Sequence, residues 1–241
     1  MEGVLFLNRS IQSHSGTAAG QAAAGQPPAP RVLIVTAVEA EREAVLRGLG
    51  GSTRFEVIAA GAGTAAAAAG TAAALAAGAY GCVISAGIGG GFPGLAPLGS
   101  LAVASEMIAA DLGAETPEGF RSAAELGFGS NTVPAAHGTA LALAAALAAA
   151  GLTVSTGPVL TVSTATGTAG TAAALAARHP GAVAEAMEGH GVAVAAQRFG
   201  IAALELRAIS NPVGPRDRAA WQIPAALDAL AAAAAILLEV L

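Results

Sequence analysis

The sequence predicts an α/β protein in three layers, with helices on both faces of a mixed, mostly parallel central sheet. Short apolar runs rich in β-branched residues alternate with alanine-rich segments of helical length, a pattern typical of a largely parallel sheet. The chain has 241 residues, 54% of them hydrophobic, which is enough to bury one core without metal ions or disulfides. One domain is therefore expected, over residues 31–241.

Residues 1–30 differ in composition from the rest of the chain. They are rich in Gly, Ala, Gln, Ser and Pro, and they show neither helical nor strand periodicity. Such a segment buries too little apolar surface to fold, so a disordered N-terminal tail is predicted. Its apolar run over residues 4–7 is too short for a secretory signal. A cytoplasmic protein is expected.

The predicted domain opens with Val32-Leu33-Ile34-Val35, a run expected of a strand buried on both faces. Further strand-like runs cover residues 55–60, 81–86, 101–105, 159–163 and 203–209. Helices are predicted over residues 38–49, 65–79, 140–150, 169–178 and 184–198. An amphipathic helix over residues 221–241 closes the chain and is expected to direct Ile223, Leu227, Leu230 and Leu237 toward the core.

Composition and charge exclude several classes of function. The formal net charge is −5, and the 11 basic residues are all arginine and scattered, so no nucleic-acid partner is expected. Without lysine, a Walker-type phosphate loop and Schiff-base chemistry are excluded. Four histidines lack metal-ligand spacing, so neither a metal nor a cofactor is expected. The alanine-rich runs fall short of the roughly 20 apolar residues that span a membrane, and Cys82 is expected to be an inert core residue.

Polar residues that directly follow the apolar runs mark the candidate site, because ligands of open α/β sheets bind beyond the carboxyl ends of the strands. Such clusters occupy residues 38–43, 85–91, 163–168 and 209–211. A fifth cluster contains Met187 and Glu188 at the start of a predicted helix. We expect these segments to meet at one edge of the sheet.

Each cluster also has a purely structural interpretation. A glutamate in a first helical turn complements the helix dipole, and periodicity does not choose between Glu39 and Glu41, which both flank the apolar stripe. The glycines over residues 87–91 suit a tight turn between a strand and a helix, and residues 163–168 suit a helix cap. Glu188 is harder to explain in this way, because a carboxylate among Ala, Gly and Val needs a partner to offset its desolvation.

Taken in order, these motifs resemble those of the nucleoside phosphorylase and nucleosidase superfamily, which includes methylthioadenosine/S-adenosylhomocysteine nucleosidase. The matching motifs are Thr36-Ala37-Val38-Glu39-Ala40-Glu41, Gly61-Ala62-Gly63, Ser85-Ala86-Gly87-Ile88-Gly89-Gly90, Ala186-Met187-Glu188 and Arg207-Ala208-Ile209-Ser210-Asn211. The resemblance implies a nucleoside phosphorylase-like fold and a small-molecule nucleoside as substrate.

The resemblance also implies roles for individual residues. Three are catalytic: Glu41 activates the attacking water, Arg207 helps to hold that water, and Asn211 contacts the base. The implied substrate-binding residues are Gly87, Thr166, Met187 and Glu188, with Glu188 on the ribose hydroxyls. Cleavage of an N-glycosidic bond passes through a ribosyl cation, so carboxylates near the sugar stabilise the developing positive charge while the base leaves neutral.

Two departures from the family pattern indicate which purine base and which nucleophile to expect. Nucleosidases that act on adenine carry aspartate at the position of Asn211; an amide instead donates to a 6-oxo group and accepts from a protonated N7, which favours a 6-oxopurine. The alternative is that Asn211 is only a turn residue before Pro212. Phosphorylases place an arginine and a serine in the loop where this chain has Ser85 and Ile88. A phosphate dianion would lack its charge partner there, so water is the expected nucleophile.

The combination of a 6-oxopurine-type asparagine with a hydrolase-type loop resembles the futalosine hydrolase family, as do residues 111–115, 125–129 and 211–218. That resemblance implies a homo-oligomeric N-ribosyl hydrolase that releases hypoxanthine from futalosine in a menaquinone route. Arg216 and Arg218 are expected to face solvent, and binding of the substrate's benzoate carboxylate is the alternative. The competing functions are a methylthioadenosine-type nucleosidase, a 6-oxopurine nucleoside phosphorylase and a nucleoside-binding protein without turnover.

Overall fold

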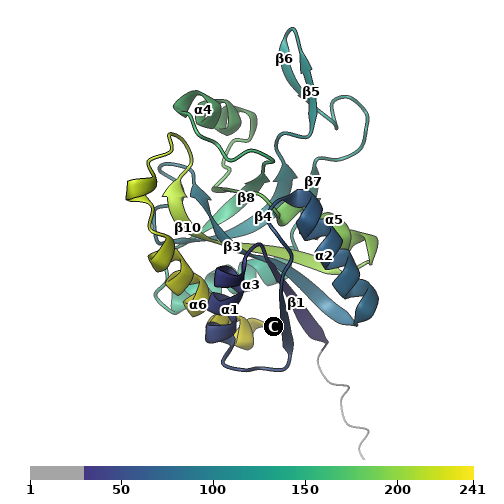
Figure 1. The fold of residues 1–241 in the computed structure, drawn as a ribbon, viewed down its shortest axis with the longest axis vertical. Coiled ribbons are helices and arrows are strands. Elements are labelled where there is room, and N and C mark those ends of the chain that lie inside the picture. The colour runs from purple at the N-terminus through teal and green to yellow at the C-terminus, as the bar shows by residue number, and fades with distance from the viewer. Residues whose placement is uncertain (1–29) are drawn as a thin grey trace, which may run out of the picture.

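A computed structural model describes residues 30–241, which form one large curved sheet with helices packed on both of its faces (Figure 1). The strands of this sheet are β1 (Arg31–Thr36), β2 (Phe55–Ala59), β3 (Tyr80–Gly91), β4 (Leu101–Ala109), β7 (Thr132–Pro134), β8 (Val154–Thr161), β9 (Ala184–Ala186) and β10 (Ala202–Pro212). A separate hairpin, β5 (Gly113–Thr116) and β6 (Gly119–Ser122), projects from the body. The tail predicted over residues 1–30 lies, apart from Pro30, outside the described residues.

The sheet is mixed and mostly parallel, as the sequence predicts. Its strand order is β10-β4-β8-β9-β3-β1-β2, with β7 on β4. Within the described residues, five of its eight strand pairings are parallel. Buried apolar residues fill β1 after Arg31, which fits a central strand covered on both faces.

Strand β3 joins the two parts of the curved sheet, because it pairs with three other strands. It pairs with β1 as far as Ser85 and with β10 over Cys82–Gly91. At Gly90 and Gly91, β3 also pairs with β9, so strands β3, β10, β4, β8 and β9 close on one another. The closure draws their ends together at the place where the polar clusters lie.

The glycines over residues 87–91 belong to strand β3, so the alternative that they form a turn into a helix is wrong. Their lack of side chains allows neighbouring backbone to approach closely. A Cβ on Gly91 would lie 2.2 Å from the carbonyl oxygen of Ala96, and one on Gly89 would lie 2.9 Å from that of Glu185. Any larger residue at Gly91 would therefore push the chain apart at the closure of the sheet.

The described part of the chain contains six α-helices, and five of them form the two outer layers. The six helices are α1 (Glu39–Leu49), α2 (Thr64–Ala77), α3 (His137–Ala149), α4 (Ala169–Arg178), α5 (Gly189–Arg198) and α6 (Ile223–Val240). Helices α1 and α3 pack beside α6 on one face, and α2 packs against α5 on the other (Figure 1). Three layers are thus confirmed, and a short 3-10 helix, η1 (Arg218–Ala220), precedes α6.

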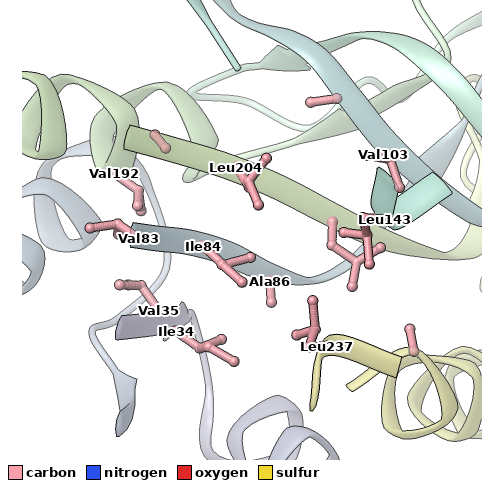
Figure 2. Close-up of a cluster of buried hydrophobic side chains, with 14 of the residues drawn as sticks. Ile34, Val35, Val83, Ile84, Ala86, Val103, Leu143, Val192, Leu204 and Leu237 are labelled. Atoms are coloured by element: carbon pink, nitrogen blue, oxygen red, sulfur yellow. The ribbon is translucent and has the colours of Figure 1, made fainter. Parts of the chain in front are cut away.

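The core lies between these layers and the sheet (Figure 2). Ile34, Ile84 and Leu204 come from three adjacent strands and are fully buried. Cys82 is buried as expected, and desolvation raises the pKa of its thiol to about 11. Burial of each large aliphatic side chain stabilises the fold by roughly 1.5–3 kcal/mol. Such residues therefore contribute much of the stability of a core that is otherwise rich in alanine.

Helix α6 alone among the described helices is long and apolar enough to cross a membrane by length and composition. It packs against α1, α3 and β10 and buries Leu230 and Leu237, so one face of this helix packs on the core. Leu227 packs partly buried against the core. Ile223, in contrast, is 37% exposed; its predicted inward orientation is wrong because it is the first residue of the helix, beyond the packed turns.

Several predicted boundaries also differ from the structure, most of all those around β9 and β8. Residues 184–186 form strand β9, whereas a helix was expected from residue 184. Alanine favours helices in isolation, but the exposed edges of β3 and β8 supply hydrogen-bond partners here, and tertiary pairing overrides the propensity. Strand β8 begins at Val154, five residues before the apolar run, because β4 pairs with it from Leu101 onward.

We expect Leu237→Ala to lower the free energy of unfolding by about 3 kcal/mol, because it leaves a cavity under α6. The adjacent Leu238 is 38% exposed, compared with 1% for Leu237, so Leu238→Ala is the matched control and should cost no more than about 0.5 kcal/mol. Urea unfolding monitored by circular dichroism measures both. Equal losses in the two variants would contradict the packing of α6 described above.

Candidate active site

The candidate site is a cavity of about 190 Å³ at the carboxyl ends of the central strands. Loops after β1 and β8, strands β3, β9 and β10, and the segment before α6 contribute to its wall. Five of the seven residues predicted from the sequence line it: Glu41, Thr166, Met187, Glu188 and Asn211. The other two, Gly87 and Arg207, lie directly behind this wall. Segments far apart in the chain thus meet in one place, as expected.

The position of Glu41 is set by the start of helix α1. Glu41 is the third residue of the helix, and its Oε2 accepts hydrogen bonds from the backbone N–H groups of Ala37 and Val38 at 2.9 and 3.2 Å. This contact satisfies donors that the first helical turn leaves free. Its Oε1 accepts a third bond, at 2.9 Å, from the N–H of Ile88 in β3. Three donors from two elements therefore fix a carboxylate that is only 4% exposed.

The structure separates Glu41 from Glu39, which periodicity left as equals and which the family resemblance had distinguished. Glu39 is exposed and pairs with Arg42 at 2.6 Å on the outer side of helix α1. Glu39 does not line the cavity. Of the two carboxylates, Glu41 is the candidate for chemistry.

Glu188 lies on the opposite wall, at the junction between β9 and α5. Its Oε1 accepts from the N–H of Gly63 at 3.0 Å, and its Oε2 accepts from the N–H of Met187 at 3.2 Å. The hydroxyl of Thr64 donates to the carbonyl of Met187, so the start of helix α2 holds both residues in place. The partner that the desolvation of Glu188 requires is Arg207, at 3.3 Å.

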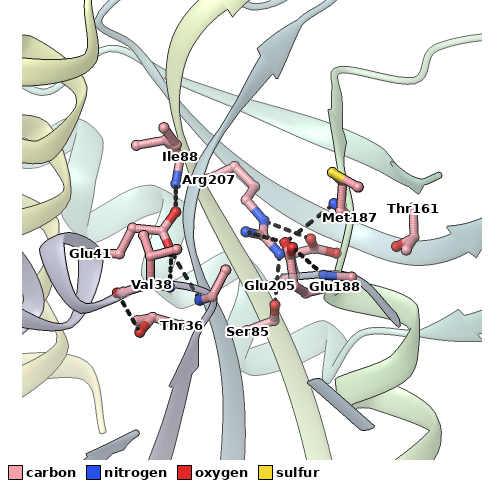
Figure 3. Close-up of polar contacts among 12 residues, drawn as sticks. Thr36, Val38, Glu41, Ser85, Ile88, Thr161, Met187, Glu188, Glu205 and Arg207 are labelled. Carbon is pink, nitrogen blue, oxygen red and sulfur yellow. Dashed lines mark hydrogen bonds and ion pairs between the residues drawn. The ribbon is translucent and has the colours of Figure 1, made fainter. Parts of the chain in front are cut away.

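Arg207 is the centre of a buried polar network (Figure 3). Its Nε donates to Glu205 Oε1 at 2.8 Å, and its Nη2 donates to Ser85 Oγ at 2.8 Å. Its Nη1 faces Glu188. The guanidinium is 1% exposed and Glu205 is 0% exposed, so these two side chains are sealed from solvent behind the cavity.

Charge governs the ionisation of this network. Burial alone would lower the pKa of Arg207, but the negative charges of Glu205, Glu188 and Glu41 outweigh burial and raise the pKa above its ordinary value. Arg207 therefore keeps its positive charge. Burial raises the pKa of Glu205, and the charge of Arg207 opposes that effect only in part.

Two glycines make room for these charged groups. Gly87 pairs with Arg207 across β3 and β10, and a Cβ there would lie 2.5 Å from Glu41 Oε1 and 2.8 Å from Arg207 Nη1. A Cβ on Gly189 would lie 2.0 Å from Glu205 Oε2. Alanine at either position would collide with a carboxylate, so Gly87 serves the site without lining the cavity.

Asn211 reaches the cavity because strand β10 is irregular. The pairing of β10 with β3 shifts between Ile209 and Asn211, which is the signature of a β-bulge at Ser210. Consecutive side chains of a regular strand face opposite sides, yet Ser210 and Asn211 both line the cavity. Asn211 Oδ1 accepts from the hydroxyl of Ser210 at 2.9 Å, and its Nδ2 donates to the carbonyl of Pro212 at 3.1 Å.

Sequence reasoning missed two buried glutamates, Glu185 and Glu205. Glu185 lines the cavity, and its carboxylate accepts from the backbone N–H of Thr166 at 2.8 Å and from the Thr166 hydroxyl. Both glutamates lie within apolar segments, where a carboxylate needs a partner; that signal was available in the sequence. In the part of the chain that the structure describes, no group of three or more His, Cys, Asp or Glu side chains is arranged to hold a metal ion.

Comparison with known proteins identifies the family. The family model described as the phosphorylase superfamily matches residues 31–241. The chain is 52% identical to the futalosine hydrolase of Streptomyces coelicolor over 231 residues, which cover 87% of this chain and 96% of that relative. It belongs to the futalosine hydrolase family. The futalosine hydrolase of Acidothermus cellulolyticus is 47% identical over 211 residues, which cover 82% of this chain and 86% of that relative.

Solved structures confirm the fold of this futalosine hydrolase family member. A methylthioadenosine/S-adenosylhomocysteine nucleosidase from Neisseria meningitidis aligns with a TM-score of 0.74 at 18% identity, over 87% of this chain and 99% of that one. The futalosine hydrolase of Helicobacter pylori aligns with a TM-score of 0.71 at 18% identity, over 87% and 96%. The nucleoside phosphorylase-like fold expected from the motifs is thus confirmed.

Glu185 should make the stability of the protein depend on pH. Burial raises the pKa of its carboxyl above the ordinary 4.5, so the folded chain holds a proton that the unfolded chain releases. The resulting stabilisation is complete below about pH 4.5 and is lost as the pH rises through the folded pKa. Glu185→Gln should therefore show a smaller decline in unfolding free energy between about pH 5 and about pH 8 than the wild type.

Urea unfolding at the two pH values measures this difference. The exposed Glu43 on helix α1 provides the control, because Glu43→Gln should follow the wild-type dependence on pH. If the unfolding free energy of Glu185→Gln also changes with pH as that of the wild type does, burial does not raise the pKa of Glu185.

Proposed function

We propose that this protein hydrolyses the N-ribosyl bond of futalosine, releasing hypoxanthine and dehypoxanthine futalosine for menaquinone biosynthesis. Two relatives named futalosine hydrolase, at 52% and 47% identity over most of the chain, support this proposal. The structural observation that carries it is the meeting of the Asn211 amide with the carboxylates of Glu41 and Glu188 around one cavity. An amide suits a 6-oxopurine, and carboxylates suit a ribosyl cation.

Asn211 is proposed to recognise the base as it leaves. Its side-chain oxygen accepts one hydrogen bond from Ser210 and its amino group donates one to Pro212, so one lone pair and one N–H remain for a ligand. The free N–H would donate to O6 of hypoxanthine, and the free lone pair would accept from a protonated N7. N7 takes its proton from solvent, so the base departs as the neutral N7–H form, which makes it a better leaving group.

Glu188, Met187 and Glu41 are proposed to act on the sugar. Glu188 would accept hydrogen bonds from the ribose hydroxyls, with Met187 beside them in the cavity wall. Glu41 would take a proton from water as the water oxygen bonds to C1′ and the bond between C1′ and N9 breaks. The electron pair of that bond goes to the base, and the two carboxylates stabilise the positive charge that develops on the ribosyl group.

Arg207 is proposed to act through the carboxylates. Its guanidinium faces Glu188 and lies behind the cavity wall, so it orients carboxylates and supplies positive charge. Gly87 leaves the space in which Glu41 and Arg207 approach each other. Thr166 lines the cavity and carries the implied contact with the substrate.

Water is favoured over phosphate as the nucleophile by the charges of the cavity. Glu41 and Glu188 line it, and like charges at about 4 Å repel by roughly 4 kcal/mol at a dielectric constant of 20. A phosphate dianion would face these carboxylates. The side chain of Ile88, which also lines the cavity, offers it no hydrogen bond.

The function is tested by incubating the purified protein with futalosine, inosine and methylthioadenosine, each with and without orthophosphate. We expect hypoxanthine from futalosine without phosphate, and loss of turnover in Glu41→Gln. Preferred release of adenine would indicate a methylthioadenosine-type nucleosidase, and dependence on phosphate would indicate a phosphorylase. Binding of futalosine without release of hypoxanthine would indicate a protein without turnover.

Asn211→Asp should lower kcat/KM for futalosine by at least about a hundredfold, because a carboxylate would face the purine oxygen with like polarity. Adenine-containing nucleosides should be affected less, since an aspartate accepts from a 6-amino group. Steady-state kinetics on both substrates measure this ratio. Equal futalosine cleavage by the variant and the wild type would contradict the role proposed for Asn211.

We further propose that the enzyme is a cytoplasmic homo-oligomer. Phe128 is 82% exposed and Leu112 is 49% exposed, near the base of the projecting hairpin, and exposed apolar side chains of this kind favour contact between copies. The single cysteine is free and buried, which is compatible with a reducing compartment. Light scattering coupled to size-exclusion chromatography gives the mass of the assembly.

A further inference from the structure

The segment from Gly214 to Trp221 closes one side of the cavity. Gly214 has a φ of 143°, which side chains rarely permit, and Pro215 follows it with a restricted φ. The carboxylate of Asp217 accepts from the N–H of Ala219 at 3.2 Å. The N–H of Gln222 donates to the carbonyl of Ser210 at 2.8 Å and ties the segment to strand β10. The segment therefore presents its side chains from a defined backbone.

Arg216 lies at the rim of the cavity, between this segment and the loop after strand β8. It lines the cavity and is exposed to solvent. A Cβ on Gly167 would lie 3.5 Å from Cδ of Arg216, so the aliphatic part of Arg216 contacts that loop. Its guanidinium carbon lies 5.1 Å from the centre of the Trp221 ring, and Trp221 lines the same cavity.

The charges around the cavity are unequally distributed. Glu41, Glu185 and Glu188 line it, and Arg216 is the only cationic residue among the described residues of its wall. Arg207, behind the wall, is paired with carboxylates. Among residues 30–241, Arg216 forms no ion pair with a carboxylate. A negatively charged part of a ligand is repelled by the glutamates, and Arg216 is the cationic residue of the wall that attracts it.

We propose that Arg216 and Trp221 form a subsite for an aromatic carboxylate carried on the non-purine side of the nucleoside. A guanidinium binds a carboxylate through two parallel hydrogen bonds, and the indole ring, which Arg216 and Arg218 both approach, packs beside an aromatic ring. This inference rests on the proposed function, because futalosine carries a benzoate group at that side. The subsite distinguishes futalosine from nucleosides with neutral substituents.

A charge-deletion experiment tests Arg216 directly. The ratio of kcat/KM for futalosine to that for its uncharged methyl ester should fall about tenfold in Arg216→Ala, mainly through KM, as expected for a charged hydrogen bond partly screened by solvent. Arg216→Lys should restore part of the ratio. Arg218 is the matched control, because it also lies over Trp221, at 5.6 Å, but does not line the cavity. Arg218→Ala should leave the ratio unchanged.

Binding to the subsite can also be measured without turnover. Trp221 is the only tryptophan in the chain, so intrinsic fluorescence excited at the indole band reports this position alone. Benzoate should change the Trp221 fluorescence of the wild type saturably, and benzamide, its neutral counterpart, should bind more weakly. Arg216→Ala should lose the preference for benzoate, whereas Arg218→Ala should keep it.

The outcomes separate this inference from the proposed function. If the wild type cleaves futalosine but Arg216→Ala keeps the wild-type ratio of kcat/KM for futalosine to that for its methyl ester, the proposed subsite is wrong and the proposed function stands. If the wild type does not cleave futalosine, the proposed function fails, and the fluorescence titration alone decides the subsite. Three results would overturn the proposed subsite. They are equal affinity of the wild type for benzoate and benzamide, no saturable fluorescence response to benzoate, and a loss of the benzoate preference that is equal in Arg216→Ala and Arg218→Ala.

Discussion

The buried charge of Arg207 is the constraint on which the site depends. Removing a guanidinium from water costs several kcal/mol unless carboxylates and hydrogen-bond acceptors surround it. The chain supplies them from separate elements: Glu205 from the same strand, Ser85 from β3, and Glu188 from the junction of β9 and α5. Because these elements touch the same guanidinium, the network fixes how the strands meet at the end of the sheet.

The same strand contacts that close the sheet also determine where the cavity lies. Strand β3 joins β10 along its length and β9 at its end, and its glycines permit that contact. Gly87 admits Glu41 and Arg207 into the same space, while the bulge at Ser210 directs consecutive side chains of β10 into the cavity. Backbone irregularity thus occurs where the chemistry needs side chains to converge.

The cavity combines acidic walls with a cationic rim. Glu41 and Glu188 lie on opposite sides of the region proposed to hold the sugar, and Asn211 presents an uncharged amide. Arg216 lies at the exposed edge beside Trp221. Such a separation of charge suits a ligand whose reacting part becomes positive in the transition state while its far end carries a negative charge.

Much of the architecture was readable from local patterns. Apolar runs located strands β1, β2, β3, β4 and β10, and alanine-rich segments located helices α2, α3 and α4, because buried strands and helices have distinct lengths and periodicities. The predicted ends of strands and helices were wrong where pairing with a strand distant in the sequence determines the secondary structure. Residues 184–186 became a strand through pairing with β3 and β8, and the glycines of 87–91 extended β3 through pairing with β10.

The sequence by itself determined the class of fold, the family motifs and five residues that line the cavity, since each depends on residue type and order. Periodicity left Glu41 and Glu39 as equals and the family resemblance pointed to Glu41, but only the tertiary structure supplied the physical reason, the N–H of Ile88, which is remote in sequence. It also revealed Glu205 as the partner of Arg207 and placed Arg216 at the cavity while leaving Arg218 outside it. These distinctions arise from burial and from contacts between distant segments, which local patterns do not encode.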